Sequence, residues 1–90
     1  MNIRRRVNII GDVQGVSFRY FLKAEADKLK VKGYAKNLWN GSVEAVFEGE
    51  FEKVRDLIKA CKMGSRAAKV KEIKITREEH KGEFNSFSIL

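Results

Sequence analysis

The chain has 90 residues, the size of one small domain, and we expect a single domain over residues 1–90. Hydrophobic residues make up 43% and charged residues 34% of the sequence, which is typical of folded globular domains and excludes a disordered chain. No apolar run approaches the roughly 20 residues that a membrane-spanning helix needs. We therefore expect no membrane partner.

Nineteen Lys and Arg residues against twelve Asp and Glu residues give a net charge of +7. Such an excess attracts anions, which include nucleic acids, anionic membranes and phosphorylated small molecules. The basic residues are dispersed along the chain, and only Arg4–Arg6 form a triplet. A solvated basic surface accounts for most of them, so charge alone does not choose among these ligands.

Residues that bind metals or form disulfides are scarce. Cys61 is the only cysteine, which excludes an intrachain disulfide, and with the single histidine, His80, it cannot complete a zinc site of cysteine and histidine alone. The basic N-terminus is not followed by the apolar segment of a signal peptide. We therefore expect a cytoplasmic protein, with Cys61 in the core and His80 in a solvated turn.

Glycines and hydrophobic periodicity divide the chain into elements, because it contains no proline. Asn40-Gly41 is a strong hairpin signal, since both residues tolerate positive φ. We expect two helices, over Phe18–Leu29 and Glu50–Met63. The expected strands are Arg5–Ile10 before the first helix, Tyr34–Leu38 and Ser42–Glu48 joined by that hairpin between the helices, and Lys69–Arg77 and the short Phe84–Ile89 after the second helix. This βαββαβ order predicts an α+β ferredoxin-like sandwich, an antiparallel sheet with two helices on one face and a short C-terminal strand.

The segment that carries chemistry is Gly11–Arg19, between the first strand and the first helix. A helix N-terminus presents unpaired N–H groups and the positive end of the helix dipole. Gly11 and Gly15 let the backbone bend closely around a ligand, and the Arg19 guanidinium can pair with phosphate or carboxylate oxygens. These features predict a cradle for a tetrahedral anion. The alternative is a tight turn beside a surface arginine.

Two motifs resemble those of the acylphosphatase family. Residues Val13–Arg19 read VQGVSFR, which is similar to the signature loop of that family. The second motif is the strand Gly33–Asn37, GYAKN, followed by a turn and by Gly41–Glu44, GSVE. The resemblance runs along nearly the whole chain, as far as Phe87–Ile89, and the sequence is identified on these motifs as a member of the family.

The resemblance implies an enzyme that hydrolyses the mixed anhydride of a carboxylic acid and phosphate, with no metal ion or other cofactor. Arg19 matches the arginine that binds the phosphate, and Asn37 matches the asparagine that positions the attacking water. The expected phosphate-binding residues are Gln14, Gly15, Val16, Ser17, Phe18 and Arg19. We expect a monomer whose partners are a small acyl phosphate and inorganic phosphate, without nucleic acid.

The residue types agree with this chemistry. An acyl phosphate has a good leaving group, so its loose transition state needs positioning and charge stabilisation more than a strong general acid. An amide such as that of Asn37 is a poor base but can hold a water with both a donor and an acceptor. The proton can pass to a phosphate oxygen of the substrate itself, as is proposed for the family.

The sequence departs from the family pattern after the second helix. The family usually carries Gly-Pro-x-x-Ala there, whereas Gly64–Ala68 reads GSRAA, and a tryptophan common near the end of that helix is absent. These departures leave the shape of the loop open but do not touch Arg19 or Asn37. Trp39 either packs beside the site or closes the hairpin.

Two other functions are compatible with this fold. A nucleic-acid-binding module would account for the positive charge, but it needs exposed aromatic side chains on the central strands, and the aromatic RNA-binding run is absent. A non-catalytic domain that binds phosphate or carbamoyl phosphate, like the acylphosphatase-type domain of hydrogenase-maturation proteins, is the second. The presence of both Arg19 and Asn37 favours the enzyme.

Overall fold

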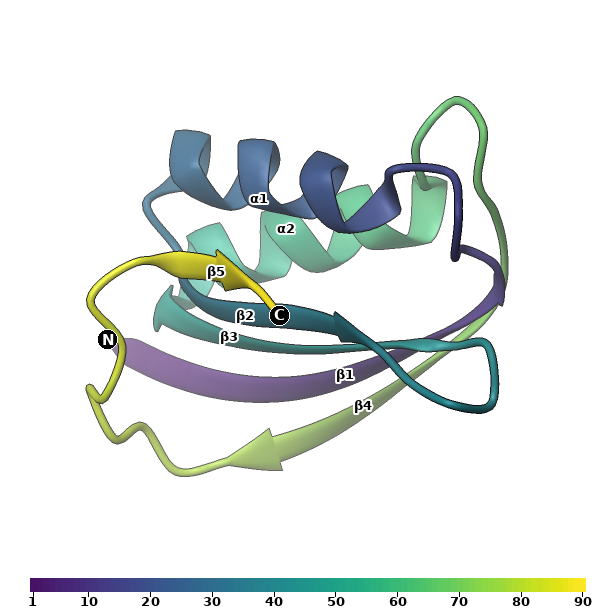
Figure 1. Ribbon diagram of the computed structural model, residues 1–90. Coiled ribbons are helices and arrows are strands. Elements are labelled where there is room, and N and C mark those ends of the chain that lie inside the picture. The colour runs from purple at the N-terminus through teal and green to yellow at the C-terminus, as the bar shows by residue number, and fades with distance from the viewer.

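The structure is a computed structural model that describes residues 1–90 (Figure 1). Its elements follow the predicted order, in the sequence β1 (Asn2–Asp12), α1 (Phe18–Leu29), β2 (Lys32–Asn37), β3 (Val43–Glu50), α2 (Phe51–Met63), β4 (Lys69–Glu78) and β5 (Phe87–Ile89). The predicted fold class, two helices on a sheet in βαββαβ order with a C-terminal strand, is confirmed.

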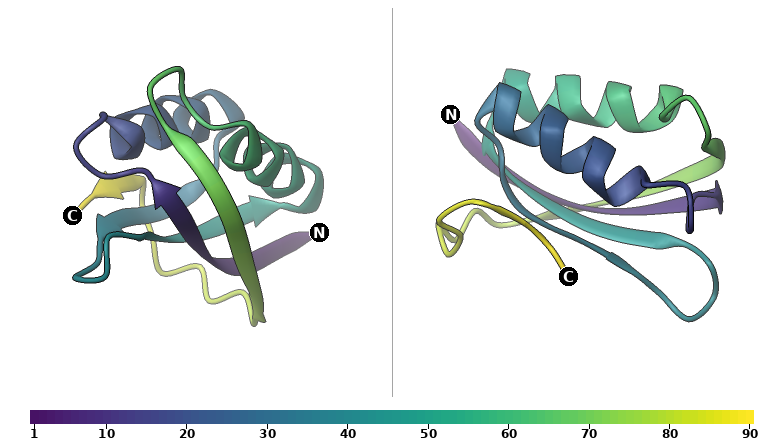
Figure 2. Two further views of the ribbon diagram at one scale, coloured as in Figure 1. Left: turned by 90° about the vertical axis from the view of Figure 1, so that its right-hand side faces the viewer. Right: turned by 45° about the horizontal axis from the view of Figure 1, so that its top comes forward.

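The strands form one five-stranded sheet in the order β4-β1-β3-β2-β5. Both helices cover the same face of this sheet, and the views in Figure 2 show that the other face carries no helix. Neighbours among the four long strands pair antiparallel, as expected. The last strand, β5, lies parallel to β2 at one edge, so the complete sheet is mixed.

Several predicted bounds need correction. β1 is longer than the expected Arg5–Ile10 at both ends, because residues 2–4 pair with β3 and Gly11 and Asp12 pair with β4. β5 is shorter than the expected Phe84–Ile89. The other bounds differ by at most two residues, and the predicted bounds of α1 are confirmed.

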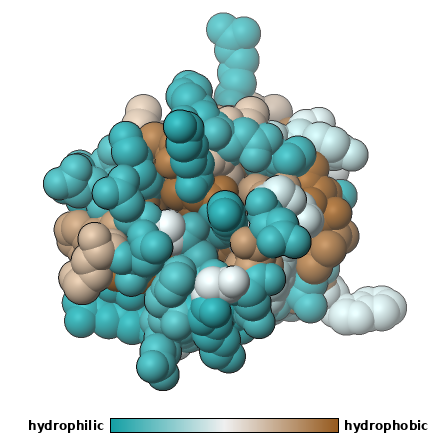
Figure 3. Space-filling view, turned by 90° about the vertical axis from the view of Figure 1, so that its left-hand side faces the viewer, coloured by the Kyte–Doolittle hydropathy of each residue, from teal (hydrophilic) through white to brown (hydrophobic).

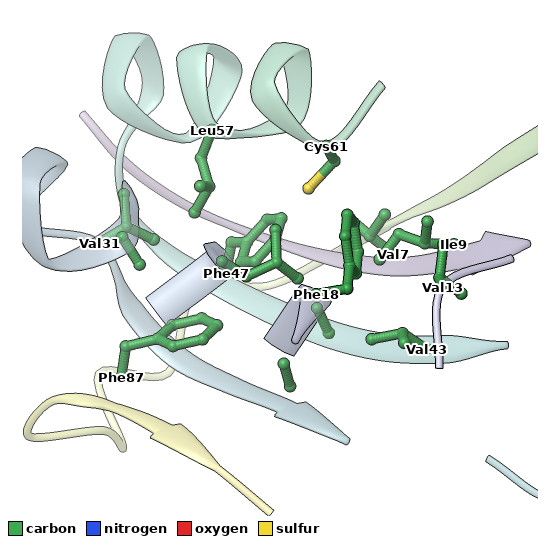
Figure 4. Close-up of a cluster of buried hydrophobic side chains, with 14 of the residues drawn as sticks. Val7, Ile9, Val13, Phe18, Val31, Val43, Phe47, Leu57, Cys61 and Phe87 are labelled. Atoms are coloured by element: carbon green, nitrogen blue, oxygen red, sulfur yellow. The ribbon is translucent and has the colours of Figure 1, made fainter. Parts of the chain in front are cut away.

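The core lies between the helices and the sheet (Figure 4). Phe18 from the start of α1 and Phe47 from β3 lie at its centre, and the Phe47 ring packs 5.9 Å from that of Phe87. Cys61 of α2 is fully buried, which confirms the prediction of a core residue, and burial raises the pKa of its thiol to about 12. The core thus fixes the beginning of α1 directly over the sheet.

The open face of the sheet carries a network of charged side chains. Arg4 is only 4% exposed and Glu48 only 3%, and the Arg4 Nη1 atom lies 3.1 Å from Glu48 Oε2. Arg4 also contacts Glu78 at 2.7 Å and Glu83 at 2.6 Å. Its guanidinium carbon lies 5.3 Å from the centre of the Phe84 ring. These contacts explain why β1 extends through Arg4 and why Phe84 leaves the last strand.

The segment between β4 and β5 is held against this open face by Glu48. The backbone N–H groups of Lys81 and Gly82 donate to Glu48 Oε2 at 2.8 and 3.3 Å. Burial by itself would raise the pKa of Glu48, but the hydrogen bonds from Lys81, Arg4 and Gly82 outweigh it and hold that pKa below its usual value. His80 lies in this segment and is exposed, as predicted.

Acid should weaken the fold through these carboxylates. Hydrogen bonds from Arg6 and Arg4 lower the pKa of Glu78 from 4.5 to about 2. Its ionised form therefore stabilises the folded chain at pH values above the pKa that Glu78 has in the unfolded chain. We expect the free energy of unfolding, measured with urea, to fall between about pH 5 and about pH 2, and Glu78→Gln to reduce this slope. Glu79→Gln, at an exposed neighbour without an ion pair, is the control, and equal slopes in both variants would contradict the assignment.

Candidate active site

The loop between β1 and α1 turns sharply before the helix begins. Gly15 has φ +75° and Ser17, the residue at the N-cap of α1, has φ 60° and ψ 26°. At Gly11, where the pairing with β4 shifts register, a Cβ atom would lie 2.1 Å from the backbone oxygen of Lys69. Only glycine fits at Gly11, so the two strands can approach closely just before the loop.

The side chain of Gln14 ties this loop to the β2–β3 hairpin. Its Nε2 atom donates to the backbone oxygens of Leu38 and Ser42, each at 2.8 Å. The hairpin is itself fastened by Asn40, whose Oδ1 accepts from the backbone N–H of Ser42 at 3.0 Å. Gln14 therefore sets the position of the loop relative to the end of β2.

The backbone N–H groups of the loop have no acceptors within the protein. From Gln14 to Tyr20, none of them donates to a backbone or side-chain acceptor, and the first bond of α1 runs from the N–H of Phe21 to the oxygen of Ser17 at 3.1 Å. Free N–H groups at the positive end of a helix dipole form an environment that favours an anion. The loop thus has the donors that the predicted cradle requires.

A cavity of about 270 Å³ opens between this loop and β2. The loop, the first turn of α1 and the last residue of β2 form its walls. The lining residues are Val13, Gly15, Ser17, Phe18, Arg19, Tyr20 and Asn37. Five residues expected at the site, Gly15, Ser17, Phe18, Arg19 and Asn37, are therefore brought together although β2 lies far along the chain from the loop. Val13 lies within the predicted loop, whereas Tyr20, which directly follows the VQGVSFR motif, was not predicted at the site.

Gln14 and Val16, also expected at the site, do not line the cavity with their side chains. The Gln14 side chain is engaged by the hairpin, and Val16 packs against the core. Any role that they have toward a ligand must therefore come from their backbone N–H groups.

Arg19 and Asn37 both keep polar groups free. Arg19 Nη1 donates to the backbone oxygen of Leu90 at 2.5 Å, and no Asp or Glu carboxylate pairs with its guanidinium. Lys23, one turn further along α1, donates to the backbone oxygen of Phe87 at 2.9 Å, so β5 steadies this helix. Asn37 is exposed, and its amide has no hydrogen-bond partner within the protein.

Trp39 and the Gly64–Ala68 segment, which departs from the family pattern, lie outside the cavity. Trp39 is 105% exposed, so it packs against nothing beside the site. Gly64 ends α2 with φ 74°, and the N–H of Ala68 donates to the oxygen of Ser65 at 3.2 Å, which closes a turn without proline. Neither segment contributes a side chain to the cavity.

A larger cavity, of about 360 Å³, lies at the opposite end of the sheet, on the side of the molecule seen in Figure 3. Its lining combines three lysines with Glu48 and Glu50, so its charges are mixed, and it contains neither Arg19 nor Asn37. No helix of the structure combines the length and hydropathy needed to cross a membrane. No group of three His, Cys, Asp or Glu side chains is placed to hold a metal ion.

Comparison with known proteins identifies the family of the chain. The family model described as acylphosphatase matches residues 5–89. The chain is 44% identical over 89 residues to the acylphosphatase of Geotalea uraniireducens, a match that covers 99% of this chain and 98% of the relative. The chain belongs to the acylphosphatase family. It is accordingly an acylphosphatase enzyme, a hydrolase that acts on acyl phosphates.

Solved structures of acylphosphatases have the same fold. The crystal structure of acylphosphatase from Bacillus subtilis superposes with a TM-score of 0.94 at 39% identity and covers 98% of both chains. Full-length HypF, crystallised in a phosphate- and nucleotide-bound form, matches the whole of this chain with a TM-score of 0.86 at 28% identity, over 12% of its own length. The fold therefore occurs both alone and within a longer protein.

Removal of the Gln14 side chain should loosen this acylphosphatase site. Gln14→Ala deletes both bonds to the hairpin, and we expect a loss of about 1–3 kcal/mol in the free energy of unfolding because two hydrogen bonds are lost, although the oxygens of Leu38 and Ser42 each keep a backbone donor. Turnover should fall as well, because the loop and Asn37 are no longer held in one geometry. Urea unfolding and acyl phosphate hydrolysis measure the two effects. Asn85→Ala, which removes an exposed amide elsewhere, should change neither, and wild-type turnover in Gln14→Ala would contradict the positioning role.

Proposed function

We propose that this acylphosphatase binds the phosphate of its substrate in the loop over residues 12–19, and that Arg19 and Asn37 carry out hydrolysis there without a metal ion. The observation that carries the proposal is the single cavity that Arg19 and Asn37 line together with residues of the loop, whose backbone N–H groups have no acceptor within the protein. Three kinds of hydrogen-bonding group, none paired with an Asp or Glu side chain, are what a phosphate and a water require.

Phosphate binding is assigned to the loop and to Arg19. The unpaired N–H groups of Gln14, Gly15, Val16, Ser17 and Phe18 would donate to the phosphate oxygens, helped by the positive end of α1. A guanidinium has five N–H donors, and only one of those on Arg19 is used within the protein, by Leu90. The remaining donors can form a two-point contact with the phosphate.

The attacking water is assigned to Asn37. Its amide offers a donor and an acceptor at the end of β2, across the cavity from the loop. A water held there attacks phosphorus, the bond from phosphorus to the acyl oxygen breaks, and its electrons leave with the carboxylate. The proton of the water passes to a phosphate oxygen, so the products are a carboxylic acid anion and inorganic phosphate.

The protein supplies the charge that a metal ion supplies in many phosphoryl transfers. Negative charge on the equatorial oxygens of the transition state is met by the fixed N–H dipoles of the loop and by the Arg19 guanidinium. The carboxylate is a good leaving group and needs no protonation by the enzyme. We therefore infer turnover in the absence of a divalent cation.

We also infer that residues 1–90 form one domain that acts as a cytoplasmic monomer on a small acyl phosphate, with no nucleic acid in the reaction. The support is that the loop, α1 and β2 of one chain build the whole cavity. A cavity of about 270 Å³ suits a small molecule rather than a polymer.

The direct test is hydrolysis of benzoyl phosphate with excess chelator present. The wild type should turn over fully, whereas Arg19→Ala and Asn37→Ala should each lose at least about a hundredfold in kcat/KM, because each removes a group that acts on the transition state. Arg19→Lys keeps the positive charge but loses the two-point hydrogen bonding of the guanidinium, so it should recover only part of the lost kcat/KM.

Arg66→Ala, at an exposed arginine in the loop after α2, is the matched control and should behave as the wild type. Circular dichroism checks that every variant is folded. Loss of wild-type activity with chelator would refute the metal-free mechanism, and folded Arg19→Ala or Asn37→Ala variants with full activity would refute the assigned roles. Phosphate binding without turnover in the wild type would leave a non-catalytic phosphate-binding domain.

A further inference from the structure

A second concave surface lies on the side of α2 that faces away from α1. Helix α2 packs on β1, β3 and β4, and β4 is an edge strand of the sheet, as the left view of Figure 2 shows. Between α2 and β4 runs a groove of about 320 Å³. None of its lining residues belongs to the cavity that contains Arg19 and Asn37.

The lining of this α2–β4 groove is half apolar and half basic. The apolar side chains are Ile3, Phe51, Val54, Ile58 and Ile75, and the basic ones are Arg5, Arg55, Lys59, Lys62 and Arg77. No acidic side chain lines the groove. Two of the large hydrophobic residues are unusually open to solvent, Ile75 at 44% and Phe51 at 46%.

The cations of the groove are poorly neutralised within the chain. Arg55 contacts the carboxylate of its neighbour Asp56 at 3.2 Å, whereas Arg5, Lys59, Lys62 and Arg77 form no salt bridge. Arg5 and Arg77 are directly opposite each other in the antiparallel pairing of β1 and β4. Like charges in opposed cross-strand positions destabilise a sheet.

The open face of the same two strands is built differently. There Arg4 and Arg6 share the carboxylate of Glu78, with contacts of 2.7 Å each. The chain thus neutralises the arginines on one face of β1 and leaves the arginine pair in the groove without a carboxylate. An anion from outside the chain would relieve that repulsion.

The edge strand adds a third feature. No strand pairs with the outer side of β4, so alternate residues along Lys69–Glu78 direct backbone N–H and C=O groups to solvent. Such an edge accepts an extended peptide as an additional strand.

We propose that the α2–β4 groove binds an extended acidic segment of a partner protein. The segment pairs with β4 through its backbone, packs an aliphatic side chain against Ile75, and places carboxylates beside Arg5 and Arg77. This interaction is separate from acyl phosphate hydrolysis, because the groove shares no residue with the cavity of the active site.

The chemistry of the groove favours a peptide over other polyanions. Single-stranded nucleic acids bind by stacking bases on aromatic rings, and Phe51 is the only aromatic residue in the lining. A lipid surface offers anionic groups but no backbone donors and acceptors for the edge of β4. An acidic peptide with aliphatic residues meets all three features at once.

The probe for this proposal is an eight-residue peptide of alternating Glu and Val with both ends blocked. Titrated into ¹⁵N-labelled protein, it should shift the amide resonances of residues 73–77 and 51–62 and leave those of residues 13–19 unchanged. Exchange of outward-facing β4 amides with solvent should slow down on binding, because a paired strand protects them. The same peptide with Lys in place of Glu should not bind, and hydrolysis of benzoyl phosphate should be the same with and without the probe.

Two charge reversals provide the matched comparison. Arg77→Glu should weaken binding of the Glu-Val peptide by at least about tenfold, and Arg66→Glu, the same change outside the groove, should weaken it far less. Arg77→Glu should also raise Tm relative to the wild type, since the new carboxylate faces Arg5 across the strands. Ile75→Thr, which keeps the strand but removes the aliphatic contact, should weaken binding without a gain in Tm.

Several results would overturn the proposal. These are absence of binding, resonance shifts confined to residues that do not line the groove, unchanged exchange of the β4 amides, or equal losses of binding in Arg77→Glu and Arg66→Glu. Binding of single-stranded RNA or of phosphatidylserine vesicles to the groove, where the peptide fails to bind, would assign the surface to one of those anions instead.

Discussion

The active site depends on hydrogen bonds between two segments that are distant in the sequence. The loop that carries the free N–H groups leaves β1, and Asn37 ends β2; Ile9 of β1 and Asn37 both pair with Val43 of β3, so the sheet brings the two segments to the same end. Beyond these strand pairs, Gln14 ties the loop to the β2–β3 hairpin, because one side-chain amide donates to two carbonyls of the hairpin at 2.8 Å each. Gln14 thus positions the loop relative to the hairpin, and its side chain does not line the cavity where a phosphate is proposed to lie. Fixed geometry of this kind is what a reaction with a good leaving group requires most.

The two faces of the sheet stabilise the site in different ways. On the helix face, apolar packing around Phe18 holds the start of α1 in place. On the open face, Arg4 and Glu48 hold the segment that follows β4, and this segment leads into β5. From β5, the backbone oxygen of Leu90 accepts a hydrogen bond from Arg19. The ionic network therefore contributes to the orientation of the arginine although it lies on the opposite side of the sheet.

The sequence predicted the element order and the bounds of α1 because glycines separate elements whose hydrophobic periods are clear. It did not predict that Glu48 is buried, since alternation in β3 places Glu48 on the open face and does not show that the segment before β5 covers it. The cavity residues of the motifs could be named in advance, but the orientation of the Gln14 side chain depends on carbonyls of a distant hairpin. Tyr20 was missed for a similar reason, because only the folded chain shows that it lies at the cavity wall. The local sequence pattern therefore predicts the helices and strands and the residue types at the site. Contacts between distant segments decide which side chains are buried and how they are oriented.

The central claim is that free backbone N–H groups of the β1–α1 loop, together with Arg19, bind the phosphate. Titration of inorganic phosphate into ¹⁵N-labelled protein, followed by amide and guanidinium resonances, tests this most directly. The account predicts saturable shifts confined to the amides of residues 14–20, the Asn37 side chain and the Arg19 side chain, and their loss in Arg19→Ala. Shifts that cluster instead around Lys30 and Lys53, at the opposite end of the sheet, or no saturable shift in the loop, would contradict it.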